Sequence, residues 1–345
     1  MTGVSGILLI DKPAGITSHD AVSHTRKAAG TRKVGHAGTL DPMATGLLVL
    51  GINSATRLLT YVVGLDKEYF ATIRLGSATS TDDREGDETF RANPETVAAI
   101  SIGDIARQIN RLTGDIDQTP SSVSAIKVDG KRAYALARAG ETVVLAARSV
   151  TVAEFELLGE PIPIDGHLDF LVRVSCSSGT YIRALARDIG LALGVGGHLT
   201  ELRRTRIGPF RVTDAAVLEN LDVAAELLHP ATVAQQLFDA VTVDQTQALE
   251  LSQGKRIELS AELATGAAIL RPAPSIAAPD PHLGPYAAIS PSGRLVGLLE
   301  IKGGRTRTLV NFPPDDATNQ CGTEPVPELD SGVFVSADAP KPAPA

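Results

Sequence analysis

Cysteine is scarce in this chain, with Cys176 and Cys321 the only two among 345 residues. Two thiols exclude a disulfide framework and a cysteine-based metal cluster, and the seven histidines show no metal-ligand spacing. Cys176 falls on the apolar face of an alternating segment, 170–176, which indicates a small core residue rather than a nucleophile. This scarcity predicts a reduced, cytoplasmic protein whose functional site holds no metal.

Long apolar runs are also absent. No stretch approaches the roughly 18 apolar residues that span a bilayer. The N-terminus lacks the basic segment of a signal peptide, and Asp11 and Lys12 end its short apolar run. We therefore expect no membrane association. Hydrophobic content of 43% and charged content of 21% are ordinary for a globular protein, and the length suffices for two domains.

Several familiar site chemistries lack their motifs. The sequence has no Gly-x-Ser-x-Gly nucleophile elbow, no Gly-Lys-Ser/Thr phosphate loop and no other cofactor motif. Aromatic content of 4% argues against an RNA module that stacks bases on an aromatic platform. A glycosidase needs a second carboxylate in a defined role. The candidates Asp82, Asp83 and Glu85 lie in a polar loop that we expect to be solvated.

The net charge of −8 argues at first against a nucleic-acid partner, but the charge is unevenly distributed. Residues 212–345 carry 8 basic and 17 acidic side chains, whereas residues 1–60 carry six basic and three acidic ones. The segment Arg203-Arg204-Thr205-Arg206 is basic enough to suggest contacts with phosphates. Local charge therefore leaves a nucleic-acid ligand open.

The most informative segment that is present is a glycine-rich loop. Its sequence from 35 to 46 is Gly-His-Ala-Gly-Thr-Leu-Asp-Pro-Met-Ala-Thr-Gly. Three glycines let the backbone turn sharply and let a ligand approach closely. Pro42 biases Asp41 towards an extended conformation, so that the carboxylate is held in a defined direction. Taken alone, an Asp-Pro pair more often only starts a turn.

Residue periodicity places this loop among mixed elements. It predicts a helix from an N-cap at Ser18 to Gly30, a half-buried strand over 69–75 and a helix over 101–112. A further helix is expected to begin at a Thr180 cap, with Arg183 in its first turn. A cation there is unfavourable by a few tenths to about 1 kcal/mol. An anionic partner would explain Arg183 better, although a solvated surface arginine is the commoner case.

The C-terminal third has a different texture. Residues 212–240 indicate an acidic, helical connector. From residue 241, short apolar runs predict a small β-rich domain, at 267–270, 287–289, 295–301 and 307–312. The Pro/Ala-rich stretch 271–285 predicts a long loop. The tail 325–345 is too polar and proline-rich to pack, which predicts disorder. From the residues alone, this is an α/β protein with an aspartate-centred site and local basic patches, and the reaction stays open.

Besides the loop 35–46, five further blocks of sequence are informative. They are Asp11-Lys12-Pro13-Ala14-Gly15-Ile16-Thr17-Ser18, Lys67-Glu68-Tyr69 with the strand to Gly76, the polar loop with Thr79, Thr81, Asp83 and Gly86, Gln118-Thr119-Pro120 with Ser124-Ala125-Ile126-Lys127 and Tyr134, and Ser178-Gly179-Thr180-Tyr181-Ile182-Arg183 followed by Leu202-Arg203-Arg204. The six blocks, in order, resemble those of the bacterial TruB-type tRNA pseudouridine-55 synthases, and the loop 35–46 resembles the catalytic motif of that family. The likeness covers about residues 5 to 211 and extends more weakly to about 312.

The resemblance implies an α+β fold in which a mixed, mostly antiparallel sheet with flanking helices forms a pseudouridine synthase catalytic domain. That domain would cover 1–240, connector included, and a PUA-like domain would cover 241–315. The implied reaction converts uridine 55 in the T-loop of tRNA to pseudouridine after base flipping. Neither a cofactor nor a metal would be needed. The partner would be the T-arm of tRNA, and the enzyme would act as a monomer without a protein partner.

The same resemblance assigns roles to residues. Asp41 would be the nucleophile, and Arg183 would pair with it and hold it ionised. Tyr69 would stack on the flipped uracil and assist removal of the C5 proton. Tyr181 and Leu202 would line the base pocket.

Contacts with the rest of the RNA are implied as well. His36 would lie near the space that the flipped nucleotide vacates. The candidates for RNA backbone contacts are Lys12, Arg203, Arg204 and Arg206. Two alternatives remain open: a catalytically silent module that binds or folds tRNA, and a pseudouridine synthase that acts on a different RNA.

Overall fold

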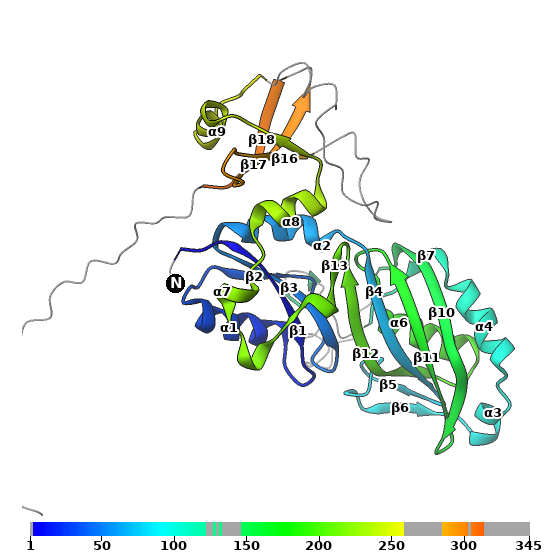
Figure 1. Cartoon of the computed structure of the whole chain (residues 1–345). Helices are drawn as coiled ribbons and strands as arrows, with labels where there is room; N and C mark the ends of the chain where they lie inside the picture. The colour runs from blue at the N-terminus through cyan, green and yellow to red at the C-terminus, as the bar shows by residue number, and fades with distance from the viewer. Residues whose placement is uncertain are drawn as a thin grey trace, which may run out of the picture. The chain divides into compact units, whose positions relative to one another are not determined.

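The computed structural model describes residues 3–121, 127–128, 131–132, 146–258, 285–302 and 305–313. Within these ranges a ten-stranded sheet carries helices on its faces, and a separate four-stranded sheet forms the C-terminal part (Figure 1). This is the predicted fold class, a mixed and mostly antiparallel sheet followed by a small β-rich region.

The large sheet runs in the order β14-β1-β3-β12-β4-β11-β10-β7, with β13 paired to β12 and β2 paired to β3. The pairs β1–β14 and β3–β12 are parallel, and the others are antiparallel. The strands are β1 (Gly6–Lys12), β2 (Val34–Ala37), β3 (Thr45–Ile52), β4 (Lys67–Leu75), β7 (Gly114–Gln118), β10 (Arg148–Ile164), β11 (His167–Cys176), β12 (Gly197–Ile207), β13 (Phe210–Arg211) and β14 (Ala216–Val217).

Helices and short hairpins connect these strands. The helices are α1 (Ser18–Ala29), α2 (Leu59–Val63), α3 (Pro94–Ala98), α4 (Ile102–Arg111), α6 (Ile182–Ala192), α7 (Val223–Glu226), α8 (Pro230–Leu237) and α9 (Gln245–Ser252). The hairpins outside the large sheet are β5 (Ser77–Thr79) with β6 (Glu88–Arg91) and β8 (Lys127–Val128) with β9 (Lys131–Arg132).

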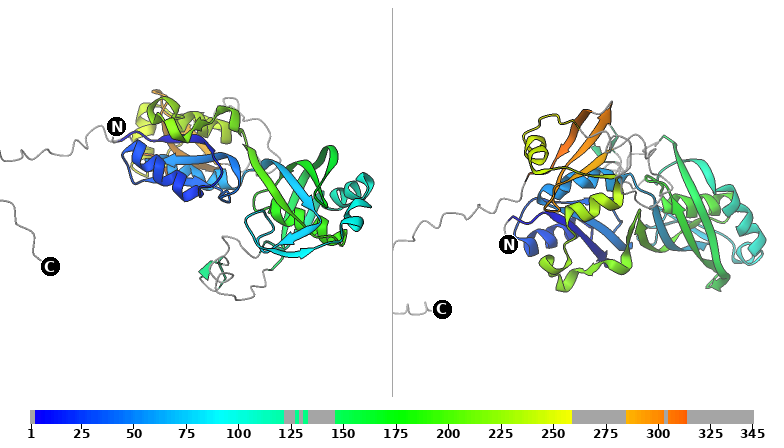
Figure 2. Two further views of the ribbon diagram at one scale, coloured as in Figure 1. Left: turned by 90° about the horizontal axis from the view of Figure 1, so that it is seen from below. Right: turned by 45° about the horizontal axis from the view of Figure 1, so that its top comes forward.

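The half of the sheet that contains β1 and β3 is covered on both faces. Successive side chains of a strand point to opposite faces. Leu8 and Ile10 accordingly pack with α1, while Ile7 and Leu9 pack with α8 and the turn before α2. Figure 2 shows helices on either side of these strands. Burial on both faces explains why β1 and β3 are almost continuously apolar.

The other half of the sheet is covered on one face by α6 and α4 (Figure 1). The predicted strand over 69–75 is confirmed as part of β4, with its odd-numbered residues buried and its even-numbered residues half-buried. Cys176 belongs to the same core, as predicted, and is 1% exposed. Burial raises the pKa of its thiol to about 11, which keeps it in the unreactive protonated form.

The C-terminal sheet contains β15 (Ala240–Thr242), β16 (Tyr286–Ile289), β17 (Leu295–Lys302) and β18 (Arg305–Asn311). One of its faces packs against α9 through Val241, Ala248 and Val296. Its other face contributes Ala287 and Leu298 to the hydrophobic cluster of Ile7 and Leu9, and Phe312, just after β18, joins the same cluster. The C-terminal sheet therefore shares buried apolar surface with β1.

Three local predictions were wrong. The N-cap of α1 is Thr17, which forms a capping box with Asp20, and Ser18 is instead buried. Helix α6 starts after Tyr181 with no side-chain cap, because Thr180 Oγ1 donates to the Ser177 carbonyl at 3.0 Å. The connector 212–240 holds only the short helices α7 and α8 between extended and 3₁₀ turns.

Other predictions lie outside the described residues. These include Ser124-Ala125-Ile126 and Tyr134, nearly all of the loop 271–285, and the tail 325–345. The division into domains at 240 and 241 stays a prediction. Across the described ranges, no helix is long and apolar enough to cross a membrane.

Gly46, at the start of β3, offers a test of this packing. Its φ is +102°, and a Cβ there would lie 2.2 Å from the Arg204 carbonyl oxygen on β12. Gly46→Ala should lower the free energy of unfolding by about 2–4 kcal/mol, because strained backbone is combined with a steric clash. Urea unfolding measures the change. The control is Gly30→Ala, where φ is +63° and the added Cβ would meet nothing within 4 Å; equal losses in both variants would contradict the packing argument.

Candidate active site

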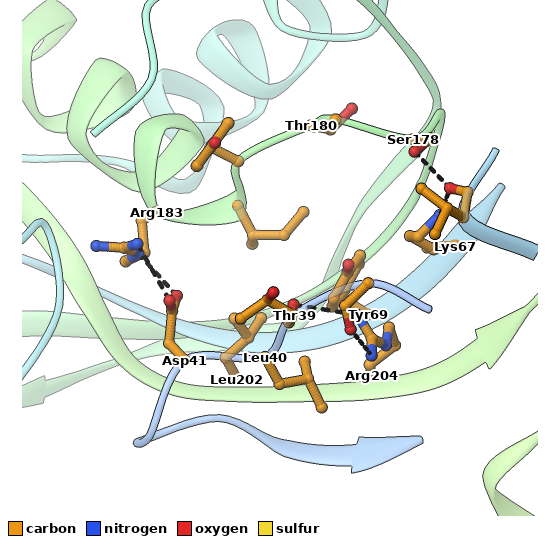
Figure 3. A pocket seen from close by; sticks show the side chains of 15 residues that line it. Thr39, Leu40, Asp41, Lys67, Tyr69, Ser178, Thr180, Arg183, Leu202 and Arg204 are labelled. Atoms are coloured by element: carbon orange, nitrogen blue, oxygen red, sulfur yellow. Dashed lines mark hydrogen bonds and ion pairs between the residues drawn. The ribbon is translucent and has the colours of Figure 1, made fainter. Parts of the chain in front are cut away.

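Four chain segments surround a pocket of about 270 Å³. They are the loop 38–41, the end of α2 with the start of β4, the segment 178–183 and the β12 segment 202–204. In Figure 3, Asp41 and Arg183 face one another on one side of the pocket, and Tyr69 and Arg204 lie on the other side. A space of this size suits one planar ring rather than a large cofactor.

The loop that carries Asp41 is held from several directions. Ser18 Oγ donates to the Leu40 carbonyl at 3.1 Å and accepts from the Leu40 amide at 2.8 Å, which ties the loop to the first turn of α1. The Pro42 carbonyl accepts from the Gly15 amide at 2.9 Å. The Asp41 carboxylate is thereby aimed from a loop that is braced on both sides, and its side chain remains 34% exposed.

Arg183 pairs with this carboxylate, as the sequence predicts. Its Nε lies 3.0 Å from Asp41 Oδ2, and its Nη2 donates to Asp41 Oδ1 at 3.3 Å. Such two-point contact fixes the orientation of a carboxylate. Burial raises the pKa of the Asp41 carboxyl, and the Arg183 guanidinium opposes that rise by favouring the charged form.

A second carboxylate lies behind Arg183. Asp83 Oδ2 is 3.4 Å from Arg183 Nη1, and the Asp83 side chain is only 4% exposed. Thr81 Oγ1 donates to Asp83 Oδ1 at 2.5 Å, and the Thr81 carbonyl accepts from Arg183 Nη1 at 2.8 Å. The prediction that this loop is solvated was therefore wrong for Asp83. Its membership of the Thr79/Thr81/Asp83/Gly86 pattern was the sequence signal for an ordered loop.

Tyr69 lies on β4 with its ring at the pocket and is 7% exposed. Burial raises the pKa of its hydroxyl, while the Arg204 guanidinium acts in the opposite direction. The hydroxyl is thus protonated at neutral pH. Tyr181 and Leu202 also line the pocket. These three residues present the apolar surface that a planar base requires.

His36 is placed differently. It lies on β2, is half-buried, and is absent from the pocket lining. Burial, followed by the charges of Arg204 and His19, lowers the pKa of its imidazole. Its Nδ1 is buried and has no hydrogen-bond partner among the described residues. The structure therefore brings Asp41, Arg183 and Tyr69 together and leaves His36 beside the site.

The basic residues expected to contact RNA phosphates are largely engaged elsewhere. Lys12 is fully buried and donates to the carbonyls of Pro13 and Ile16. Arg204 is 1% exposed and donates to the carbonyls of Leu47 and Gly38. The burial of both side chains leaves little surface for a phosphate, and their contact with RNA stays a prediction. Both side chains brace the loop that carries Asp41.

The remaining two candidates are paired with carboxylates. Arg203 donates to Asp11 at 3.0 and 2.7 Å, and Arg206 donates to Asp66 Oδ2 at 2.7 Å. An arginine in such a pair has less of its charge available to a phosphate. The dense basic segment on β12 therefore serves mainly internal contacts.

Sequence reasoning missed two groups that shape the pocket. Lys67 Nζ donates to the Val63 carbonyl at 3.0 Å, and Ser178 Oγ donates to the same carbonyl at 2.7 Å. Gln118 holds Tyr181 by donating to its carbonyl at 3.0 Å and accepting from its amide at 2.7 Å. Lys67 and Gln118 both lie in blocks that carry the family resemblance, which was the available signal.

Comparisons with known proteins identify the class. The N-terminal domain model of the TruB family pseudouridylate synthases matches residues 26–182. The model of the tRNA pseudouridylate synthase B C-terminal domain matches 183–249, and that of the tRNA pseudouridine synthase II C-terminus matches 238–313. Together the three matches run from residue 26 to residue 313.

Curated relatives and a solved structure point to the same class of protein as the family models. The chain is 56% identical over 312 residues to tRNA pseudouridine synthase B of Leifsonia xyli subsp. xyli (strain CTCB07), covering 90% of this chain and 98% of that protein. It is 50% identical over 314 residues to the protein of that name from Arthrobacter sp. (strain FB24), covering 91% and 98%. The crystal structure of a Cbf5-Nop10-Gar1 complex contains a chain with a TM-score of 0.61 at 25% identity, covering 90% of this chain and 86% of that one.

The fold and the family models are those of a pseudouridine synthase, an isomerase. Within that class, the identity over nearly the full length shows that the chain belongs to the TruB family of pseudouridylate synthases.

The buried carboxylate behind Arg183 gives a first prediction for the site. Asp83→Asn should lower kcat for pseudouridine formation about 10- to 100-fold, because Arg183 loses one of the two carboxylates that aim it. Since the negative charge of Asp83 raises the pKa of Asp41, the acid limb of the rate profile should also move to lower pH. The matched control is Asp82→Asn, which removes a neighbouring carboxylate that pairs with Arg187 at 3.3 Å. Equal kcat values for the two variants would contradict the proposed role of Asp83.

Lys67 gives a prediction for stability. Burial and the nearby Arg204 charge lower its pKa to about 8 from 10.5, so between these values the unfolded chain binds more protons than the folded one. The stability of the wild type relative to Lys67→Met should rise with pH in this window, by about 1.4 kcal/mol per pH unit. Urea unfolding at several pH values measures the difference. For Lys255→Met, at an exposed lysine, the difference in free energy of unfolding from the wild type should not change with pH. If the difference for Lys67→Met did not change with pH either, the lowered pKa of Lys67 would be contradicted.

Proposed function

We propose that this chain isomerises uridine 55 in the T-arm of tRNA to pseudouridine, with Asp41 as the nucleophile. The observation that carries the proposal is an aspartate aimed by a buried arginine into a pocket that also contains a tyrosine ring. Two relatives that match nearly the whole chain bear the name tRNA pseudouridine synthase B, which supports tRNA as the substrate.

The reaction rearranges bonds without net gain or loss of atoms. The bond from N1 of uracil to C1′ breaks, the base turns while bound, and C5 bonds to C1′. The C5 proton leaves, and N1 gains a proton. Asp41 supplies the nucleophile, because Arg183 favours its ionised form against the effect of burial. No step requires an oxidant, a metal or a cofactor.

The shape of the pocket supports flipping of the uridine. A stacked base hides the atoms that react, so the nucleotide must leave the helix to reach Asp41. A pocket of about 270 Å³ accepts one base, and Tyr69, Tyr181 and Leu202 provide its walls. The raised pKa of Tyr69 keeps its hydroxyl protonated, which favours stacking as its main role over proton removal.

The proposal extends to the setting of the enzyme. The chain acts in the cytoplasm as a monomer, recognises the T-arm, and requires no protein partner. Chemistry resides in residues 1–240, and residues 241–315 form an accessory PUA-like domain. A catalytically silent tRNA-binding module would not need the paired Asp41 and Arg183. A pseudouridine synthase that acts on a different RNA would have the same site, so only the identity of its substrate separates it from this proposal.

The deciding experiment incubates the full chain with an unmodified tRNA transcript and maps pseudouridine. We expect modification at position 55, none in a transcript that carries cytidine there, and loss of turnover in Asp41→Asn with tRNA affinity kept within about threefold, because the amide keeps the shape but is a poor nucleophile. Turnover by Asp41→Asn near that of the wild type would remove Asp41 from the mechanism. Modification only at other positions or in other RNAs would overturn the assigned substrate.

A further inference from the structure

Eight arginines of residues 1–240 form ion pairs with carboxylates. Arg74 pairs with Asp169, Arg203 with Asp11, and others follow the same pattern: Arg91, Arg107, Arg173, Arg183, Arg187 and Arg206. The buried cations Lys12 and Arg204 donate to backbone carbonyls. A phosphate backbone therefore needs a different set of cations from those that the sequence suggested.

One cluster of cations stands apart. Arg26 and Lys27 lie in the last turn of α1, and Arg32 and Lys33 lie in the loop that leads to β2. We call these four residues the α1–β2 basic patch. Within the described ranges none of them makes an ion pair, and Lys27, Arg32 and Lys33 are exposed. An open hollow runs among them, lined by Arg26, Lys27, Gly30, Thr31 and Arg32 with no carboxylate.

The helix terminus explains only part of this cluster. Cations in the last turn of a helix are favoured by its dipole, by about 0.3–1 kcal/mol, which accounts for Arg26 and Lys27. Arg32 and Lys33 lie beyond the helix and gain little from it. The Arg26 side chain uses Nη2 to donate to the Val34 carbonyl at 3.1 Å, while its buried Nε has no hydrogen-bond partner among the described residues.

The patch is coupled by geometry to the pocket. The first turn of α1 is hydrogen bonded to the catalytic loop through Ser18 and Leu40. The helix of 12 residues then extends about 18 Å to the patch. Strand β2 returns from the patch directly to the loop that holds Asp41. Along the helix, the exposed residues His19, Ser23 and Lys27 follow at intervals of four and so share one face.

We propose that the α1–β2 basic patch binds the phosphate backbone of the RNA whose uridine enters the pocket. This inference rests on the proposed function and names a contact surface for its substrate. The patch holds the RNA at one end of the α1–β2 pair while Asp41 acts at the other end. Because phosphate contacts position a nucleic acid without reading its sequence, the patch contributes affinity and register rather than base specificity.

The test is the triple variant Lys27→Gln/Arg32→Gln/Lys33→Gln in the full chain. Its control, Arg91→Gln/Arg107→Gln/Arg305→Gln, changes the net charge equally at exposed arginines outside the patch. Direct titration with the unmodified tRNA transcript from about 0.05 to 0.3 M salt gives Kd and its salt dependence. Pseudouridine formation at saturating tRNA gives kcat.

For the patch variant we expect Kd to rise at least tenfold near 0.1 M salt. The log–log salt slope should fall in magnitude by about 0.7–0.9 for each phosphate that the variant no longer neutralises. The maximal rate should fall by less than threefold, and the control should keep the Kd and slope of the wild type. A patch variant with the Kd and slope of the control overturns the inference, as does an effect confined to kcat. Absence of pseudouridine from the wild-type reaction would instead refute the proposed function, while the binding titration would still test the patch.

Discussion

The guanidinium of Arg183 is the group on which the site depends. It lies on α6 and is 6% exposed, and it joins the loop that carries Asp41 to the loop after β5, which carries Asp83. Removing one partner from a buried ion pair costs about 3–5 kcal/mol, because the remaining charge is left without compensation. Two carboxylates on one guanidinium avoid that state and fix its plane. Because α6 packs against the sheet, the position of Arg183 is fixed. Arg183 in turn fixes the direction of the Asp41 carboxylate.

The local structure around this ion pair follows from residue patterns. Alternation in β4 and β11 identified the buried faces of both strands, including Cys176, because the period of a strand is two wherever one face is buried. The wrong caps at Ser18 and Thr180 have different causes. The Ser18 hydroxyl bonds to Leu40, far along the chain, and the residues next to Ser18 do not reveal that competitor. The Thr180 hydroxyl instead donates to the carbonyl of Ser177 in the preceding turn.

The charged residues show the same limit more clearly. Arg203 and Arg204 are adjacent in sequence, yet on a strand they point to opposite faces. Arg204 is opposite Tyr69 in the register of β12 with β4 and is buried, whereas Arg203 is opposite Phe70 and pairs with Asp11. Four residues that look like one basic surface in the sequence are therefore divided between the two faces of β12. Asp83 was missed for the converse reason, since a polar loop was interpreted as solvated when it packs beneath an arginine.

The balance of charges has a consequence for how an acidic protein could meet RNA. Screening limits the influence of an exposed charge to about 8 Å at physiological salt, so the net charge of −8 matters less than the charges nearest the approaching phosphates. Eight arginines of residues 1–240 are held in ion pairs, whereas the four cations of the α1–β2 basic patch make no ion pair within the described ranges. Because α1 is bonded to the catalytic loop at one end and carries the patch at the other, a backbone held on the patch is placed at a set distance from Asp41. In the proposed function, the helix thereby connects the surface that holds the RNA backbone to the pocket in which the uridine reacts.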